Sequence, residues 1–327
     1  MIDVHISFPP AESSLEILDA LLDSQFRIST GENITHAEPL NYLVSGRPKR
    51  DEITGCPNLK ALIIPFAGIP AQTQTLMQEF PNISVHNLHH NAVPVVENTL
   101  ALLLAACKHL IPAHNALREN DWRPRYAPNP SMLLQNKTAL LLGYGEIGSR
   151  LGRVLDALDM NILAIRNSIS ALERDRFAMI YPSGNLLELL PRADILVDTL
   201  PLTQQTEGMI GKKELSLLPK GAIVVNVGRG KVIDQHAFYD ALKEGHLGAA
   251  AIDVWYQYPE DEESRADTMP AEVPFGELDN VVLSPHRAGG LHSEDTERLR
   301  MEHLAGLLNH AARNEPLPNR VDLKRGY

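Results

Sequence analysis

Three glycines in Gly143-Tyr144-Gly145-Glu146-Ile147-Gly148 have the spacing of a turn that binds phosphate groups. The turn follows the apolar run 138–142, and apolar residues then recur at helical spacing from Ile147 to Leu158. In such a strand–turn–helix, Gly143 permits the tight turn, Gly145 lets backbone N–H groups approach a pyrophosphate, and Gly148 lets helix and strand pack closely. We therefore predict that this segment binds a dinucleotide.

The residues after the next strand candidate, 161–165, bear on which dinucleotide binds. NAD-binding domains carry an acidic residue about 20 positions after the turn, where it holds the ribose hydroxyls. This chain has Arg166-Asn167-Ser168 there, without a carboxylate. A guanidinium can pair with a 2′-phosphate, and Ser168 can add a hydrogen bond. The sequence therefore favours NADP over NAD; the alternative is that Arg166 points to solvent and either cofactor is accepted.

An arginine and a histidine follow two later strand candidates, in Asn226-Val227-Gly228-Arg229-Gly230 and in Ser284-Pro285-His286. Ligands of open α/β sheets bind at the carboxyl ends of strands, so both side chains are candidates for one site. Reduction of a 2-oxo acid needs a cation for the carboxylate and a general acid for the carbonyl oxygen. We predict that Arg229 supplies the first and His286 the second.

Two series of strands and helices must position these residues. Strand candidates of the first are 2–8, 42–45, 59–65 and 83–86, with helix candidates at 12–23 and 71–79. Those of the second are 138–142, 161–165, 194–200, 222–227, 249–254 and 281–284. A long apolar helix is expected over 95–118, and a final helix after Gly289-Gly290 with Ser293 as its N-cap. Alternating strands and helices predict parallel sheets, and 327 residues suffice for two domains.

The composition and charge of the chain indicate which classes of partner to expect. The net charge of −11 and the lack of a long basic run argue against a nucleic-acid partner. No apolar stretch reaches the roughly 20 residues of a membrane span, and the N-terminus has no secretory pattern. The two cysteines, Cys56 and Cys107, lack metal-ligand spacing and suit a reducing compartment. We expect a cytoplasmic protein that binds a small molecule and no metal.

Taken together with Leu200-Pro201-Leu202-Thr203 and the segment 248–254, these motifs resemble the D-isomer-specific 2-hydroxyacid dehydrogenase family, most densely over 87–290. The resemblance implies a Rossmann-type doubly wound parallel sheet domain over 97–289. It also implies a discontinuous flavodoxin-like α/β substrate domain from 1–96 and 290–327, a cleft active site, and a homodimer formed through the long helix near Val95.

The resemblance also assigns binding residues. Those expected to bind the cofactor are Gly143, Tyr144, Gly145, Glu146, Ile147, Gly148, Arg166, Asn167, Ser168, Leu200, Pro201, Val227, Gly228, Asp253, Ala288 and Gly289. Those expected to bind the substrate are Ala67, Gly68 and Ile69, through backbone N–H groups, and Asn91.

One position departs from the family pattern. The family pairs its histidine with a glutamate, whereas Asp253-Val254-Trp255-Tyr256-Gln257-Tyr258-Pro259 has Tyr258 at that place. A carboxylate raises the pKa of a neighbouring imidazole, and a neutral tyrosine can offer only a hydrogen bond. We predict that Tyr258 modulates His286 and that His286 is a weaker proton acceptor than the histidine of ordinary family members. Reduction should therefore be favoured at lower pH. Arg287 is also unusual and could meet a second acidic group of the substrate or form an interdomain salt bridge.

Two other functions stay open. Formate dehydrogenases of this family also lack the glutamate, and Asn91 stands in the register of their formate-binding asparagine, six residues before Glu97. The fold also serves as a nucleotide-sensing corepressor without catalysis. The sequence ranks reduction of a 2-oxo acid first and does not name the acid.

Overall fold

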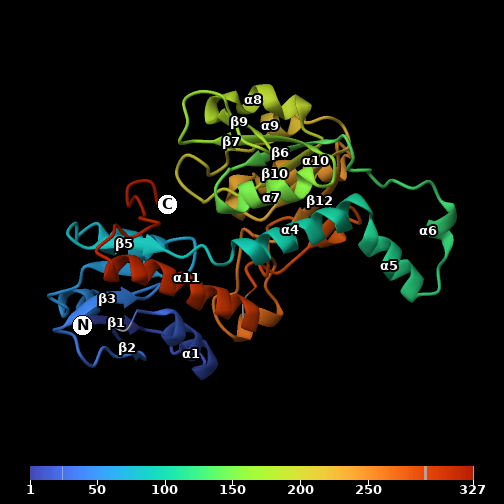
Figure 1. The fold of residues 1–327 in the computed structure, drawn as a ribbon. Helices are drawn as coiled ribbons and strands as arrows, with labels where there is room; N and C mark the ends of the chain where they lie inside the picture. Colours follow the sequence, from blue (N-terminus) through green and yellow to red (C-terminus); the bar gives the residue numbers. More distant parts are fainter. Residues whose placement is uncertain (24, 291–292, 327) are drawn as a thin grey trace. The chain divides into compact units, whose positions relative to one another are not determined.

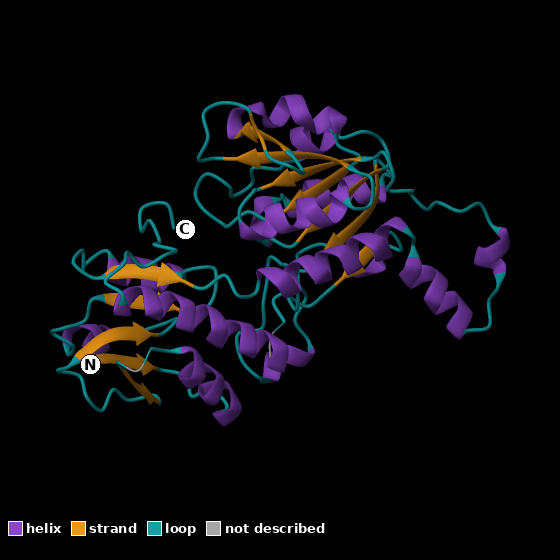
Figure 2. Cartoon of the chain, viewed as in Figure 1, coloured by secondary structure: helices purple, strands orange, loops and turns teal. Residues whose placement is uncertain are grey.

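The computed structural model describes residues 1–23, 25–290 and 293–326. The chain divides into two compact units, one formed by Met1–Asn91 with Gly290–Tyr327 and the other by Ala92–Gly289 (Figures 1 and 2). The predicted boundaries lie at 96/97 and 289/290. Both units are α/β with largely parallel sheets, and the predicted fold class is confirmed.

The first unit has a five-stranded parallel sheet in the order β2-β1-β3-β4-β5. Its strands are β1 (Ile2–Ile6), β2 (Phe26–Thr30), β3 (Leu40–Val44), β4 (Ala61–Ile64) and β5 (Ser84–Asn87). Helices α1 (Glu12–Leu21) and α11 (Glu294–Ala312) pack on one face, and α2 (Arg50–Thr54) and α3 (Ala71–Met77) on the other. Tyr42, Leu43 and Val44 of β3 alternate between these two cores, as the pleat requires.

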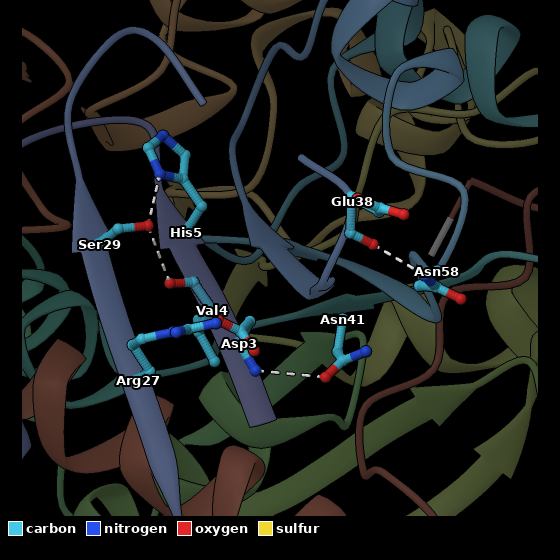
Figure 3. A network of polar contacts seen from close by, with 8 residues as sticks. All are labelled: Asp3, Val4, His5, Arg27, Ser29, Glu38, Asn41 and Asn58. Carbon is cyan, nitrogen blue, oxygen red and sulfur yellow. Dashed lines mark hydrogen bonds and ion pairs between the residues drawn. The ribbon is translucent and has the colours of Figure 1, made fainter. Parts of the chain in front are cut away.

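Polar side chains on β1 are paired within this sheet (Figure 3). Both ring nitrogens of buried His5 are within 2.9 Å of an oxygen, Nδ1 of the Ser29 hydroxyl and Nε2 of the Gly31 carbonyl. Asp3 forms an ion pair with Arg27, and its N–H donates to Asn41. Structural hydrogen bonds and an ion pair therefore account for Asp3 and His5 of this inner strand.

The second unit has an eight-stranded sheet in the order β13-β12-β11-β10-β6-β7-β9-β8, parallel except for β8. The strands are β6 (Thr138–Leu142), β7 (Asn161–Arg166), β8 (Glu173–Arg174), β9 (Met179–Pro182), β10 (Ile195–Asp198), β11 (Ala222–Asn226), β12 (Leu247–Ile252) and β13 (Val281–Leu283). One core packs the sheet against α4 (Ala92–Cys107) and α7 (Glu146–Asp156). The other core contains α9 (Lys212–Leu217) and α10 (Gln235–Lys243), and α8 (Leu186–Leu189) contributes Leu189.

The helix predicted over 95–118 is wrong as a single element. The chain forms α4 and α5 (Leu110–Arg118), which are bent by 69° at a break where His109 has a left-handed φ of 46°. Pro112 accounts for the break, because proline has no N–H to donate to residue 108 and its ring clashes with that carbonyl. The short helix α6 (Arg123–Tyr126) follows, and α5 and α6 project away from the sheet of this unit (Figure 1).

The sequence reading missed β2, β8 and β9. Ser293 stands at the N-cap of α11 as predicted, but its side chain makes no capping hydrogen bond. Within the described ranges no single helix is long and apolar enough to cross a membrane, although the bent pair α4–α5 passes that test by length and composition.

Candidate active site

The glycine turn lies at the point where the strand order of the second unit reverses. From β6 the chain first builds β7 and β9 on one side and then returns to β10 on the other. Gly143 has a left-handed φ of 92°, and its N–H donates to Ile165 O at 3.1 Å. Thr199, directly after β10, donates its hydroxyl to Leu142 O at 2.9 Å. The turn is thus held by both neighbouring strands.

The glycines of the turn have the environments that a pyrophosphate site requires. A Cβ on Gly148 would lie 2.1 Å from Gly143 O, so the start of α7 touches the turn backbone. A Cβ on Gly145 would meet nothing within 4 Å, and α7 begins at the next residue, Glu146. The first N–H groups of a helix have no partner within it and favour an anion. These residues fit a dinucleotide phosphate.

The side chain of Tyr144 does not face this open space. It is buried, and its hydroxyl donates to Asp175 Oδ2 at 2.6 Å. Burial and the neighbouring carboxylate raise the phenol pKa well above its usual range. Tyr144 therefore anchors the turn to the loop before β9, and only its backbone borders the predicted cofactor site.

Arg166 ends β7 with an exposed side chain and forms no ion pair with any residue in the described ranges. Asn167 and Ser168 follow it, also exposed, and Asn167 Oδ1 accepts from Ser183 Oγ at 3.2 Å. An exposed, unpaired guanidinium next to the glycine turn suits a 2′-phosphate.

Three adjacent strands of this sheet are followed by loops that buried polar side chains hold. Asp198 ends β10, Asn226 ends β11 and Asp253 follows β12, each no more than 1% exposed. Asn226 Oδ1 accepts the Gly228 N–H at 3.2 Å, and its Nδ2 donates to Arg229 O at 3.3 Å. The sequence reading did not assign Asp198 or Asn226 to the site. The available signal was a polar residue ending a strand that is otherwise apolar.

Asp253 holds the loop that carries His286. Its Oδ1 accepts the Ser284 hydroxyl and, at 2.9 Å, the Arg287 N–H, while its Oδ2 accepts the Ala288 N–H at 3.0 Å. His286 itself adopts a left-handed φ of 55° between these anchors. The arrangement makes Asp253 a structural support of the histidine loop, and the Arg287 side chain is exposed.

Arg229 and His286 lie within electrostatic reach of each other. Burial is the main cause that lowers the His286 pKa below its ordinary value; the Asp253 charge opposes this and the Arg229 charge adds to it. The Arg229 side chain is partly buried, with Nη1 donating to Gly228 O at 2.6 Å. The structure thus brings together the two residues predicted to act on the substrate.

Tyr258 contacts His286 through its ring. The ring centroids are 5.5 Å apart with an interplanar angle of 51°, and the Tyr258 hydroxyl accepts the Trp255 N–H at 3.0 Å. The expected modulation by a hydrogen bond is therefore replaced by a packing contact that withdraws the imidazole from water. Tyr258 is itself 45% exposed, so its ring lies between part of the His286 side chain and solvent.

The remaining predicted cofactor residues also lie at carboxyl ends of strands. After β10, β11 and β13 these are Leu200, Pro201, Val227, Gly228, Ala288 and Gly289. In the described ranges, no three His, Cys, Asp or Glu side chains are grouped to hold a metal ion.

The predicted substrate residues belong to the first unit. Ala67, Gly68 and Ile69 follow β4, and the carbonyl of Ala67 accepts from Asn87 Nδ2 at 2.5 Å. Asn91 has a buried Oδ1 without a hydrogen-bond partner in the described ranges. Their role toward a substrate stays a prediction.

Comparison with known families agrees with this geometry. The family description "D-isomer specific 2-hydroxyacid dehydrogenase, NAD binding domain" matches residues 100–288. The chain belongs to the D-isomer specific 2-hydroxyacid dehydrogenase family. The resemblance inferred from the motifs is thereby confirmed.

Individual members of this family are similar over different lengths. A D-3-phosphoglycerate dehydrogenase of Methanocaldococcus jannaschii is 28% identical over 99% of this chain, and a glyoxylate reductase of Aeropyrum pernix is 37% identical over 64%. The chain spans 60% of the length of each. A solved 2-hydroxyacid dehydrogenase from Xanthobacter autotrophicus, in complex with NADPH and MES, aligns with a TM-score of 0.80 and 23% identity, covering 100% of this chain and 99% of that one. This last likeness shows the shared fold.

Alanine at two glycines should separate folding from binding. Gly148→Ala forces a Cβ onto Gly143 O and should lower the free energy of unfolding by about 1–3 kcal/mol. Gly145→Ala has open space and an ordinary φ of −96°, so it should fold normally and bind the dinucleotide more weakly. Urea unfolding and fluorescence titration with NADPH measure the two effects. Equal stability of both variants would contradict the described packing.

Proposed function

We propose that this chain is an NAD(P)-dependent oxidoreductase that transfers hydride between nicotinamide and a 2-oxo or 2-hydroxy acid, mainly as a reductase. One observation carries the proposal: Arg229 and His286 lie within reach of each other on the sheet whose switch point holds the glycine turn. The names of the relatives, a glyoxylate reductase and a D-3-phosphoglycerate dehydrogenase, support this substrate class.

Each side chain has a defined task in this reaction. When bound, the nicotinamide supplies or accepts the hydride. The Arg229 guanidinium binds the substrate carboxylate and polarises the carbonyl, and protonated His286 donates its ring proton to the carbonyl oxygen. Asp253 holds the histidine loop through the N–H groups of Arg287 and Ala288.

We propose NADP as the preferred cofactor, held at Arg166, Asn167 and Ser168. The exposed, unpaired guanidinium and the absence of an acidic residue at the end of β7 support this preference. The NADPH bound in the Xanthobacter structure is consistent with it.

We further propose that Ala67, Gly68, Ile69 and Asn91 bind the substrate and that the first unit is the substrate domain. The buried Asn91 Oδ1 supports this role, because a buried acceptor needs a donor and the hydroxyl of a 2-hydroxy acid can supply one.

A cytoplasmic homodimer completes the proposal. Helices α5 and α6 contain no buried residue. The large apolar side chains exposed on or beside them are Leu110, Ile111, Leu117, Trp122 and Tyr126. A surface of this kind supports a subunit interface. Both cysteines are free and buried, which suits a reducing compartment.

A substrate panel tests the function. With NADPH we expect turnover of at least one small 2-oxo acid among glyoxylate, hydroxypyruvate and pyruvate. Arg229→Ala and His286→Gln should each lower kcat/KM by about 10²-fold or more, because each removes a group that acts on the substrate in the transition state. Arg192→Ala, at the opposite edge of the sheet, is the matched control. NADPH binding without turnover of any 2-oxo or 2-hydroxy acid, or of formate, would favour the sensing function.

Arg166→Ala tests cofactor preference. Loss of a charge-assisted hydrogen bond should weaken NADPH binding by about 10–100-fold and NADH binding by less than threefold. Titrations of both cofactors measure the ratio, with Arg174→Ala on β8, which β9 separates from β7, as the control. Equal loss for the two cofactors would exclude a contact with the 2′-phosphate.

Tyr258→Glu tests the electrostatics of His286. The His286 pKa is lowered, so kcat/KM for reduction should fall as pH rises through a value below that of free histidine. A carboxylate beside the imidazole should move this decline upward by about one pH unit or more. Tyr258→Phe keeps the ring and should leave the decline in place. Identical pH–rate profiles for the wild type and Tyr258→Glu would show that His286 is not the titrating acid.

A further inference from the structure

Asp198 is the most deeply buried carboxyl group of the second unit, with 0% of its surface exposed. It ends β10, the strand between β6 and β11, and its backbone pairs in register with Leu142 and Asn226. A charged group at such a position is expensive unless it is paired. No part of the proposed reaction uses it directly.

The contacts of its carboxyl group reach two loops of the site. Oδ1 accepts the N–H of Leu200 at 3.0 Å, and Oδ2 lies 3.5 Å from the N–H of Arg229. A Cβ on Gly228 would come within 2.6 Å of Oδ2 and 2.8 Å of the Leu200 backbone. The carboxyl group is thus wedged between the Leu200 loop, predicted to contact the cofactor, and the Arg229 loop.

The chemistry of this position favours a carboxylate. Two backbone N–H donors point at it, and an ionised carboxylate accepts from both, whereas an asparagine would turn an NH₂ group toward one of them. The titratable or charged groups that interact with it in the described ranges are Arg229 and Tyr256. Arg229 stabilises the ionised form, and Tyr256 stays neutral because burial raises its pKa.

We infer that Asp198 is a positioning residue that ties the Arg229 loop to the Leu200 loop, and so places the guanidinium that binds the substrate carboxylate. The inference rests on the proposed function for the identity of that substrate. The tie between the loops rests on the contacts alone.

The charge of Asp198 affects the stability of the fold. Burial raises the Asp198 pKa to about 7, although the two N–H groups and Arg229 oppose the shift. The folded pKa lies above the unfolded value of 3.8, so the ionised group destabilises the fold increasingly as pH rises from about 4 to 7.

The decisive variant is Asp198→Asn, with Asp194→Asn as its matched control. Asp194 precedes the same strand and accepts the Thr138 N–H at 2.9 Å at the opposite edge of the sheet. At pH 8, Asp198→Asn should have a Tm equal to or above that of the wild type. Its KM for the 2-oxo acid should rise at least tenfold, with a smaller change in kcat. Asp194→Asn should leave both kinetic constants within twofold.

Hydrogen exchange followed by mass spectrometry tests the tie without any substrate. In Asp198→Asn, peptides that contain Leu200 and Arg229 should exchange faster, while peptides of β12 should not. Unchanged exchange in the variant would overturn the inference even if the enzyme is active. Faster exchange in an enzyme inactive on every acid would uphold the tie and reject only the proposed function.

Discussion

Hydrogen bonding of buried polar groups where the central strands end is the constraint on which the second unit depends. Strands β10, β11 and β12 lie side by side and are covered on both faces. The first polar groups after these strands are therefore shielded from water. Asp198, Asn226 and Asp253 stand at these ends and must find partners there. The partners they find are the backbone N–H groups of the following loops. The loops that carry Arg229 and His286 are therefore fixed by the packed interior of the sheet.

This constraint also shapes the electrostatics of the site. Two of the three side chains at these ends are acidic, yet both oxygens of Asp253 are engaged with Ser284, Arg287 and Ala288. Its charge raises the His286 pKa, but burial prevails and the pKa stays below the ordinary value. The imidazole is held in place by groups that do little to keep it protonated. The position of His286 and its affinity for a proton are thus determined by different groups.

Local patterns made part of this site predictable from the sequence. The glycine turn, the strand over 138–142 and the residues Arg229 and His286 each follow from a few neighbouring residues, and no distant contact had to be known. The break at His109 also had a local signal, Pro112, which the prediction of one long helix over 95–118 did not take into account. Strand β2 was missed because its residues are only partly buried and alternate irregularly. For Asp198 the local signal was only a polar residue at the end of an apolar strand. The pairing of β10 with β6 and β11 is needed to show that this strand is central.

Tyr258 shows that one residue can affect the support of the loop and the proton affinity of His286 in different ways. At the position where the family resemblance predicts a glutamate, the tyrosine hydroxyl accepts the Trp255 N–H at 3.0 Å. The ring then covers His286 at 5.5 Å and contributes to the burial that lowers its pKa. Tyr258 therefore supports the backbone of the loop without placing a negative charge beside the histidine. Because the shape of the loop depends on hydrogen bonds and the proton affinity on charge, this position can change the pH range of the proposed reaction without changing the fold around it.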